Sequence, residues 1–467
     1  MPGRTERDSL GELQVPSAAY YGIQTVRAAE NYPISGWKPY PRLIDAYMYQ
    51  KKASALANKE GGALDAKIAG AIMQACDEIL GGKLRDQFIV DVFQAGAGVS
   101  QHMNTNEVLA NRANEILGSG KGTYSPVHPN DHVNFGQSTN DTYPTAMRVA
   151  ALLCERDFDP VLEALESSLD ERARRFDRII KSGRTHMQDA TPVRLGQEFA
   201  GYARAVGRGR RVLREACRHA EELGLGGTAT GTGLNTARGY RERAIAHMRE
   251  FTGLDLRPSP DMREAMQSNL PMAAVASAQR MIALELIRIT NDLRLLSSGP
   301  ITGLAEITLP PVQPGSSIMP GKVNPAILEM VAMVAFQVVG NSTAVDHAVQ
   351  SGQLELNVMM PAMAFNTLMS FHILQSSLTV LRTRCIDGLE ANEEACRRYA
   401  EMSPSLATAL NPYIGYAQGA EVVKQALREG KTIPSVVLEK GLMSKEELDR
   451  ILDPIKMTEP GIIGKKK

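Results

Sequence analysis

Residues 326–340 read AILEMVAMVAFQVVG, directly after Pro325, and this stretch decides the fold class. Proline is favoured in the first turn of a helix, so Pro325 marks a helix start. Apolar side chains cover more than one face of the helix that follows, which is typical of a helix buried on several sides. Glu329 and Gln337 interrupt the apolar run, which is too short to span a bilayer. We therefore predict one member of a large helical bundle.

Four other stretches show comparable helical patterns. Leu162, Leu165, Leu169, Ala173, Phe176 and Ile180 recur at steps of three and four, opposite a charged face. At roughly 25–35 residues, such helices are far longer than the usual 11–12. One chain could hardly cover five of them, so we predict an all-α subunit whose bundle is completed by other subunits. The remaining helices are expected over about 193–223, 262–296, 325–349 and 361–381.

The two ends of the chain differ from its middle. Prolines between Val15-Pro16 and Tyr40-Pro41 break up the start, and two helices are expected over about 43–58 and 65–80. From about Asn392 the chain changes to short segments punctuated by glycine and proline. We predict three domains: a mixed, helical domain over residues 1–138, the five-helix bundle over 139–392, and a small helical domain over 393–467.

Composition excludes several classes of protein. Lys plus Arg and Asp plus Glu both number 52, so the net charge is zero, which argues against a partner bound through nucleic-acid phosphates. The five cysteines are odd in number, widely spaced and without a CxxC pair, which favours a reducing cytoplasm over a disulfide framework. The polar start lacks a secretory signal. We predict a cytoplasmic protein without a nucleic-acid or membrane partner.

The sequence offers no motif for a metal or a cofactor. It contains neither HExxH nor a cluster of cysteines and histidines. The segment 224–233, GLGGTATGTG, is rich in glycine, but it follows a helix and lacks the GxGxxG pattern of dinucleotide sites. We therefore predict that no cofactor is required.

Polar and turn-rich segments between the helices are the places for chemistry. They supply hydroxyls, amides, His186 and Lys322, which together suit the carboxylates of a small acid. Such a set does not form a metal cage. The segments are QAGAGVS (94–100) with NTNE (104–107), HPND (128–131) with QSTND (137–141), GRTHMQD (183–189) and GSSIMPGKVNP (315–325).

The segment 315–325 is the most informative of these. Its glycines make it mobile, and it carries Ser316 and Ser317 shortly before Lys322. A flexible loop of this kind can close on a substrate, exclude water and bring in a base. It can also serve as a helix start, with Asn324 as the capping residue and Pro325 in the first turn. The two roles are compatible.

Glu329 and His186 form a second candidate pair. Glu329 lies inside the apolar helix, where an unpaired carboxylate is costly. His186, in a polar connection between two long helices, is a plausible partner. The alternative partner is an Arg or Lys from a neighbouring helix, and His186 could equally be an ordinary surface residue.

At this point the motifs resemble a known family. The eleven residues 315–325 are similar to the signature loop of the aspartase/fumarase superfamily, and GRTHMQDA (183–190) and QSTND (137–141) resemble two further blocks in the same order. The resemblance covers essentially the whole chain. It implies a homotetramer with a central bundle of about twenty helices, five from each subunit, and active sites built from three subunits.

The resemblance also implies a reaction. Members of the superfamily eliminate an amine or a hydroxyl from C2 of a succinyl group and release fumarate, through an aci-carboxylate formed when the C3 proton leaves. By resemblance, Ser316 is the base, and the donors to the aci-carboxylate are Ser138, Thr139 and Ser317. The other carboxylate is held by Thr185, Lys322 and Asn324. The leaving group is contacted by Asn140 and His186, and Glu329 polarises His186.

Several blocks resemble aspartases more than fumarases. Examples are YYGIQT (20–25) and SGQLELN (351–357), together with Thr139 where fumarases tend to have a second serine. They imply reversible elimination of ammonia from L-aspartate, a step of amino-acid metabolism. The alternatives are a class II type fumarate hydratase and a carbon–nitrogen lyase for a substituted aspartate. A non-catalytic structural protein on this scaffold is a remote alternative, which the retained Ser316, Lys322, His186 and Glu329 oppose.

One position departs from both families. Val99 stands where the family has a threonine that helps to bind the carboxylate and amine of the substrate. Valine lacks the hydroxyl, so a hydrogen bond is missing unless Ser100 replaces it. The departure leaves open whether the substrate is L-aspartate or a substituted relative. The physiological direction, metal stimulation and effectors leave no trace in the sequence.

Overall fold

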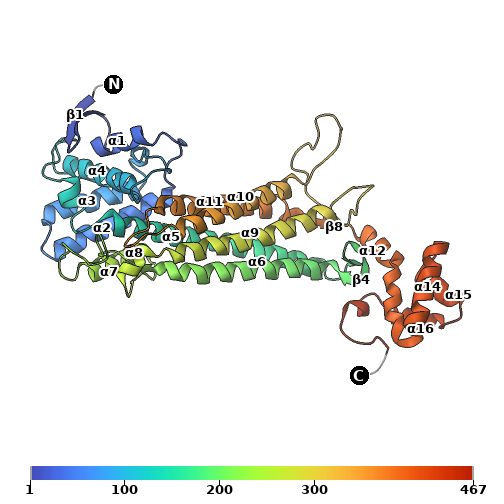
Figure 1. The fold of residues 1–467 in the computed structure, drawn as a ribbon. Helices are drawn as coiled ribbons and strands as arrows, with labels where there is room; N and C mark the ends of the chain where they lie inside the picture. Colours follow the sequence, from blue (N-terminus) through green and yellow to red (C-terminus); the bar gives the residue numbers. More distant parts are fainter. Residues whose placement is uncertain (1–2, 465–467) are drawn as a thin grey trace. The chain divides into compact units, whose positions relative to one another are not determined.

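A computed structural model describes residues 3–464, and helices make up most of them (Figure 1). This confirms the predicted all-α class. The five long helices have 24–37 residues and lie where they were expected. They are α5 (Thr139–Arg175), α6 (Leu195–Arg218), α9 (Leu270–Leu296), α10 (Ala326–Val349) and α11 (Met360–Arg384).

Two details of the predicted helices were wrong. The helix expected from Met262 is divided into α8 (Met262–Gln267) and α9, and Pro271 lies in the first turn of α9. Proline has no N–H to donate, so it begins a helix more readily than it continues one. Ile180 belongs to a strand, because α5 ends at Arg175.

Packing divides the chain into two compact units, and each long helix contributes one stretch to each of them. Unit 1 comprises the described residues up to 160, 209–283 and 335–375. Unit 2 comprises residues 161–208, 284–334 and the described residues from 376. The three predicted domains stay a prediction, although α5 begins at Thr139 and α12 at Glu393.

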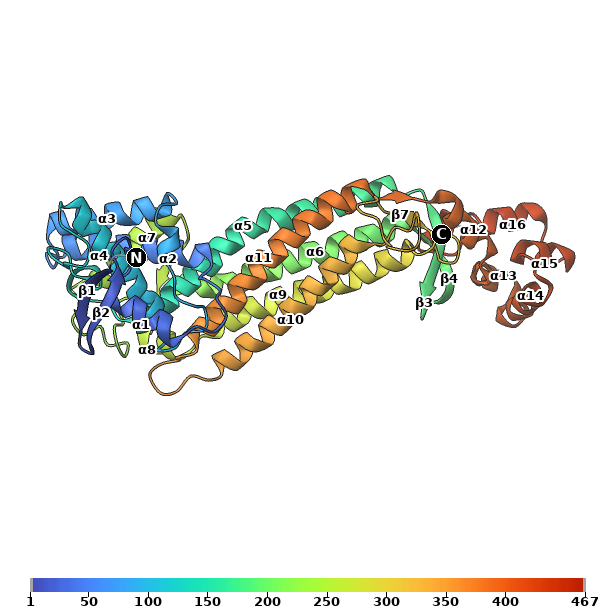
Figure 2. The same cartoon turned by 90° about the horizontal axis from the view of Figure 1, so that it is seen from above.

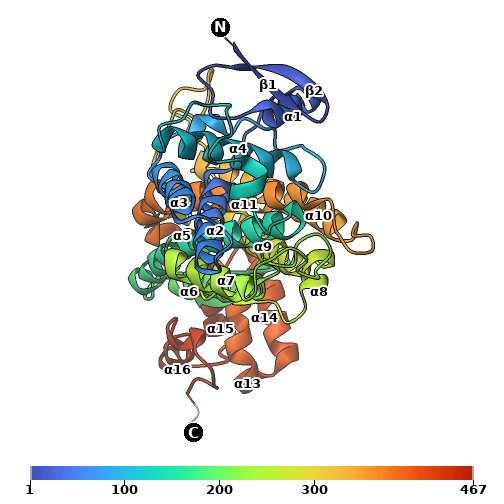
Figure 3. The same cartoon turned by 90° about the vertical axis from the view of Figure 1, so that its left-hand side faces the viewer.

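Unit 1 contains a small helical cluster beside its stretches of the long helices. The helix α2 (Pro41–Glu60) packs against α3 (Ala66–Leu80) and α7 (Tyr240–Thr252), and α3 packs against α4 (Val99–Ile116) (Figure 3). Its core includes the fully buried Tyr47 and Ile72. The unit begins with an antiparallel hairpin of β1 (Gly3–Asp8) and β2 (Gly11–Pro16), followed by α1 (Ile23–Asn31). This hairpin is not among the elements predicted from the sequence.

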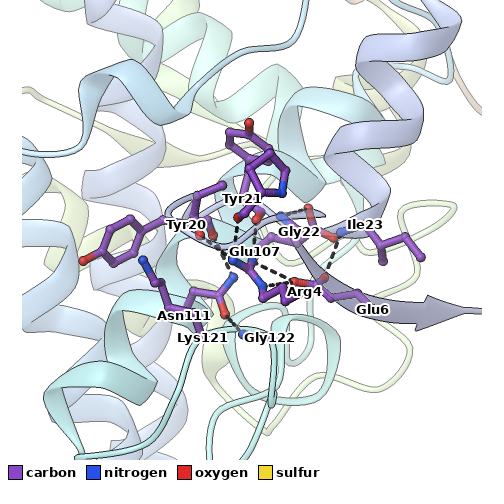
Figure 4. A network of polar contacts seen from close by, with 12 residues as sticks. Arg4, Glu6, Tyr20, Tyr21, Gly22, Ile23, Glu107, Asn111, Lys121 and Gly122 are labelled. Atoms are coloured by element: carbon purple, nitrogen blue, oxygen red, sulfur yellow. Dashed lines mark hydrogen bonds and ion pairs between the residues drawn. The ribbon is translucent and has the colours of Figure 1, made fainter. Parts of the chain in front are cut away.

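A buried carboxylate fastens the start of α1 to α4 (Figure 4). Glu107 of α4 accepts hydrogen bonds from the backbone N–H groups of Gly22, Gln24 and Thr25, at 2.9, 2.9 and 3.1 Å, and from the Thr25 hydroxyl at 2.6 Å. Burial raises the pKa of Glu107 to about 7, and these donors oppose the rise. Arg4 adds hydrogen bonds to Glu6 and to four carbonyl groups of the segment 16–21.

Unit 2 contains a second hairpin and the C-terminal helices. The strands β3 (Ile180–Thr185) and β4 (Gln188–Arg194) pair antiparallel, and β3 packs against α12 (Glu393–Met402) (Figure 2). Buried ion pairs anchor β3, since Lys181 lies 2.8 Å from Glu198 and 3.0 Å from Glu306, which also binds Arg184. The last helices share a core of their own. They are α13 (Asn411–Ile414), α14 (Tyr416–Glu429), α15 (Ile433–Glu439) and α16 (Lys445–Ile451).

Short strand pairs complete the described structure. The strands β5 (Glu222–Leu223) and β6 (Arg257–Pro258) are parallel and belong to unit 1. The strands β7 (Ile307–Thr308) and β8 (Glu390–Ala391) are antiparallel and belong to unit 2.

Large apolar side chains of α9 and α10 remain exposed on the single chain. Leu284 is 53% exposed, Met333 62% and Phe336 58%. Both helices have the length and apolar composition of a membrane-spanning segment, a property they share with the core helices of soluble bundles. The helix α10 reaches this length because it continues from the apolar run 326–340 to Val349. Exposed apolar stripes of this kind mark a contact surface. The tetramer that would cover them stays a prediction.

Candidate active site

The start of α5 presents three of the predicted site residues. The Ser138 hydroxyl accepts from the Asn140 N–H at 3.2 Å, and Asp141 accepts from the Ser138 N–H at 2.9 Å. This reciprocal cap fixes the first turn of the helix. The Asn140 side chain donates to the carbonyl of Ala229 at 2.9 Å. A capped helix N-terminus carries a partial positive charge, so this turn suits a carboxylate group of a ligand.

The Thr139 hydroxyl contacts a row of buried polar side chains. Its Oγ1 atom lies 2.7 Å from Nδ1 of His102, and Nε2 of His102 lies 2.7 Å from Nζ of Lys51. Lys51 and His102 are completely buried. Burial lowers the pKa of Lys51 to about 7 and holds the pKa of His102 well below its ordinary value. Neither Lys51 nor His102 is among the site residues predicted from the sequence.

A signal for Lys51 was nevertheless present in the sequence. Lys51 is three and four residues after Met48 and Tyr47, two side chains on the buried face of α2. Residues three or four apart share one helix face, so a charge at this position needs polar partners. A charge on an apolar helix face singles out Lys51 as it does Glu329.

Asp141 connects the capped turn to the glycine-rich segment 224–233. Its Oδ2 atom accepts from the backbone N–H groups of Gly226 and Thr228, both at 3.0 Å. Burial raises the pKa of Asp141 to about 7, while the three N–H donors favour the carboxylate. The backbone N–H groups of the glycine-rich segment therefore bind the Asp141 carboxylate of the protein itself.

Thr185 and His186 lie at the tip of the β3–β4 hairpin, on the exposed surface of unit 2. Thr185 pairs with Gln188, so His186 and Met187 form a two-residue turn. Their φ angles are 54° and 61°, a left-handed conformation that usually requires glycine or asparagine. Strain of this kind concentrates at functional sites. His186 is exposed at this turn.

The predicted loop is closed at its base. The Gly315 N–H donates to the carbonyl of Lys322 at 2.7 Å, and the Asn324 side chain donates to the carbonyl of Gly315 at 2.7 Å. A Cβ atom at Gly315 would lie 2.7 Å from the Asn324 nitrogen, so only glycine permits this approach. The Asn324 side chain thus closes the loop, which leaves Ser317 and Lys322 exposed.

The Ser316 hydroxyl accepts two backbone hydrogen bonds within this loop. Its Oγ atom accepts from the backbone N–H groups of Ile318 at 3.2 Å and Met319 at 3.0 Å. Two amide donors aimed at one oxygen stabilise negative charge on it. The same pattern caps an ordinary serine turn, so the role of Ser316 as the base stays a prediction.

Glu329 faces Arg294 of α9 in the single chain. The shortest distance between the guanidinium and the carboxylate is 3.9 Å, and both side chains are 42% exposed. An arginine from a neighbouring helix is the alternative partner that the sequence left open. The pairing of Glu329 with His186 stays a prediction.

The predicted residues form separate groups in the two units. Ser138, Thr139 and Asn140 belong to unit 1, whereas the hairpin tip and the loop belong to unit 2. Among the described residues of unit 2, no hydrogen bond or ion pair joins the hairpin tip to the segment 315–324. Val99, 42% exposed, is the first residue of α4 in unit 1.

A cavity of about 890 Å³ occurs elsewhere in unit 2. Its lining combines Arg178 and Arg397 with Glu393, Glu401 and Asp449, and it includes none of the predicted site residues. Within residues 3–464, no three His, Cys, Asp or Glu side chains are grouped so that they could hold a metal ion.

Comparison with known proteins places this arrangement in a family. Residues 11–340 match a family described as lyase, and residues 406–459 match the fumarase C C-terminus. The chain belongs to the aspartase/fumarase superfamily. Other superfamily members match it over nearly their whole length. An aspartate ammonia-lyase of Bacillus subtilis is 45% identical over 462 residues, covering 99% of this chain and 97% of that protein.

Fumarases of the superfamily are equally similar. A class II fumarate hydratase of Halobacterium salinarum is 50% identical over 462 residues, covering 99% of this chain and 98% of that protein. A crystal structure of a fumarate lyase, also termed delta crystallin, from Brucella melitensis is 47% identical, with a TM-score of 0.95 and coverage of 98% of this chain and 100% of that one. The relatives establish a lyase, and aspartases and fumarases occur among them at comparable identity.

Proposed function

We propose that this lyase eliminates ammonia from L-aspartate to give fumarate, reversibly, with Ser316 as the base. The observation that carries the proposal is the pair of backbone N–H groups that meet at the Ser316 oxygen. A serine hydroxyl is not basic at neutral pH unless its anion is stabilised. The two amides supply that stabilisation, with Lys322 as the nearby cation of the loop.

In the proposed mechanism, the Ser316 alkoxide takes the proton from C3 of L-aspartate. The electron pair of the C3–H bond moves into the neighbouring carboxylate, which becomes a doubly charged aci-carboxylate. Donors that are already oriented toward this group lower the barrier most effectively. The proposal gives that task to Ser138 and Thr139 at the start of α5 and to Ser317 of the loop.

Collapse of the aci-carboxylate completes the reaction. Its electron pair forms the C2–C3 double bond, the C2–N bond breaks, and the nitrogen leaves with the bonding pair as ammonia. Asn140 and His186 contact the leaving group, with Glu329 polarising His186. Holding the second carboxylate fixes the substrate for this step, and that carboxylate is assigned to Thr185, Lys322 and Asn324.

We infer that the active site is completed by assembly into a homotetramer. Exposed apolar side chains on α9 and α10, such as Met333 and Phe336, support contacts between long helices of different subunits. Five helices from each of four subunits give a core of about twenty helices. Three subunits would then contribute the start of α5, the hairpin tip and the loop. A solution mass of four subunits supports this assembly, and a stable monomer contradicts it.

Fumarate hydratase is the second candidate, favoured by the 50% identical relative. A substituted aspartate is a third candidate, favoured by Val99, which lacks the hydroxyl that the threonine of both families offers to the substrate. Under both alternatives the Ser316 base and the aci-carboxylate are unchanged, and only the leaving group differs.

Incubation with L-aspartate, L-malate and N-substituted aspartates separates these functions. The proposal predicts that L-aspartate produces fumarate, followed by its ultraviolet absorbance, and an equal amount of ammonia. Fumarate from L-malate alone would establish the hydratase. Product from the substituted amino acids alone would establish the related carbon–nitrogen lyase. No product from any of them would favour a structural role.

A further inference from the structure

Lys51 is held by three acceptors deep inside unit 1. Its Nζ atom lies 2.7 Å from Nε2 of His102, 3.1 Å from Oδ1 of Asn134 and 2.9 Å from Oε1 of Gln137. A protonated lysine has three N–H donors and no acceptor, so three acceptors satisfy it completely. The arrangement is that of a buried ammonium group, although no carboxylate within residues 3–464 forms an ion pair with it.

The orientation of both amides supports this assignment. The Asn134 nitrogen donates to the carbonyl of Gln137 at 3.2 Å. The Gln137 nitrogen donates to the carbonyls of Val133 and Phe135 at 3.1 and 3.3 Å. Because each nitrogen is used in this way, each amide oxygen faces Lys51. The ammonium of Lys51 therefore has two of its donors fixed, and the third points at His102.

The position of Lys51 determines the tautomer of His102. A neutral imidazole donates from one nitrogen and accepts at the other. Nε2 faces an ammonium donor, so it accepts, and the proton belongs on Nδ1. Nδ1 then donates to Oγ1 of Thr139 across 2.7 Å. Since Thr139 accepts from His102, its own hydroxyl hydrogen is free to point away from the protein interior.

We propose that Lys51 and His102 are positioning residues that hold the Thr139 hydroxyl as a hydrogen-bond donor toward the substrate carboxylate. This inference rests on the proposed function, in which Thr139 stabilises the aci-carboxylate. Neither residue touches the substrate. Each acts by fixing the direction of the hydrogen bonds in the chain Lys51–His102–Thr139, so that no reorientation is needed when negative charge develops.

The direction of the hydrogen bonds from Lys51 through His102 to Thr139 reverses when Lys51 is neutral. A lysine amine keeps two N–H donors for Asn134 and Gln137 and presents its lone pair to His102. His102 then carries its proton on Nε2 and accepts the hydrogen of Thr139 at Nδ1. In this state the Thr139 oxygen turns lone pairs toward the carboxylate, which weakens its stabilisation.

The reversal falls within an accessible pH range, because burial lowers the pKa of Lys51 to about 7. The other titratable groups around Lys51 are His102 from α4, Asp141 from α5 and Cys76 from α3. Asp141 favours the ammonium, and burial keeps Cys76 a neutral thiol by raising its pKa. Tyr240 of α7 lies close to Asp141, and burial raises the pKa of its hydroxyl well above the ordinary value. Neither Cys76 nor Tyr240 titrates near pH 7. The protonation of Lys51, together with that of Asp141, therefore determines the direction of the hydrogen bonds between Lys51, His102 and Thr139.

A double-mutant cycle on kcat for L-aspartate, or for whichever dicarboxylic acid the protein turns over, tests the proposal. Thr139→Val removes the donor and should lower kcat roughly 10²-fold, because the hydrogen bond strengthens in the transition state. His102→Phe keeps an aromatic ring beside Tyr47 but removes both nitrogens, and should cost about as much. In the Thr139→Val background, His102→Phe should have no further effect. Independent, multiplying losses would overturn the proposal.

Two further variants separate positioning from folding. His102→Gln can accept from Lys51 and donate to Thr139, so it should recover most of the kcat that His102→Phe loses. If His102→Phe fails to fold, Lys51→Met combined with His102→Phe removes the buried charge and should reproduce the kcat of Thr139→Val. Tyr47→Phe is the matched control: it keeps the ring stacked on His102 at 5.9 Å and removes a hydroxyl that has no hydrogen-bond partner among the described residues. It should leave kcat unchanged.

A readout without substrate distinguishes failure of this inference from failure of the proposed function. Nitrogen NMR of histidine-labelled protein, with His102→Gln for assignment, should show the Nδ1–H tautomer of His102 at pH 6 and the Nε2–H tautomer at pH 9. An Nε2–H tautomer at pH 6 would overturn the inference even in an active enzyme. Absence of product from every dicarboxylic acid would refute the proposed function and leave the NMR result to decide the inference.

Discussion

The start of α5 and the loop 315–324 differ in how they hold their polar groups. The α5 turn is fixed by a reciprocal cap, by Asp141 and by buried partners of Thr139. The loop is closed at Gly315 and Asn324, while Ser317 and Lys322 stand exposed between these ends. In the proposed mechanism the α5 turn supplies rigid donors and the loop supplies a mobile base, because charge stabilisation requires preorganisation whereas substrate entry requires an opening. Substitutions in the two regions should therefore have different consequences.

The largest effect is expected on the mobile side. Ser316→Ala removes the proposed base and should lower kcat at least about 10³-fold on the substrate. The side chain is only partly buried, and among the described residues its hydroxyl is hydrogen-bonded only within its own loop, so the free energy of unfolding should change by less than about 0.5 kcal/mol. Steady-state kinetics and thermal unfolding measure the two quantities. A fully active Ser316→Ala enzyme would refute the assignment of the base.

On the rigid side, Asp141→Asn should reduce stability. It places an amide nitrogen or a weaker acceptor opposite the buried N–H groups of Ser138, Gly226 and Thr228, at a cost of about 1–3 kcal/mol in the free energy of unfolding. Denaturant unfolding of the assembled protein measures this cost. An exposed matched control, Asp131→Asn, should cost less than about 0.5 kcal/mol. Equal stability of the two variants would show that Asp141 does not fix the turn.

Lys51, which is buried behind the rigid region, should change how the free energy of unfolding depends on pH. The pKa of Lys51 is about 7 in the folded protein and about 10.4 in an unfolded chain. Between these values the unfolded state binds more protons, so this group makes the free energy of unfolding rise with pH. Lys51→Met should remove that rise. Parallel curves for wild type and Lys51→Met from pH 7 to 10 would contradict the buried, shifted lysine.

A smaller effect is expected at Val99, the first residue of α4, three residues before His102, which contacts Thr139 of the rigid region. Val99→Thr restores a hydroxyl, and one hydrogen bond of about 0.5–1.5 kcal/mol corresponds to a gain of roughly two- to tenfold in kcat/KM on L-aspartate. The gain should be absent with L-malate if the hydroxyl contacts the amine. A gain beyond about 100-fold, or about 2.7 kcal/mol, would indicate that the native substrate is a different amino acid.

The comparison also separates what the sequence could predict from what it could not. The long helices were predictable because apolar periodicity and prolines such as Pro325 act locally along the chain. The loop 315–325 was recognisable because its residues are contiguous. The Lys51–His102–Thr139 chain joins three helices across 51 and 37 residues, so no local pattern specifies it. The strained turn at His186 was also missed, since neither His186 nor Met187 is a residue that favours a left-handed turn.

The central claim is that the α5 turn and the loop act on one substrate from different subunits. Mixing subunits that carry Ser316→Ala with subunits that carry Ser138→Ala and Thr139→Val tests this claim, with mixed tetramers verified by mass. Each parent protein should be nearly inactive. If the two regions come from different subunits, random mixing leaves about a quarter of the sites with both regions intact, and activity should return to that level. Mixed tetramers that remain inactive would contradict the shared site.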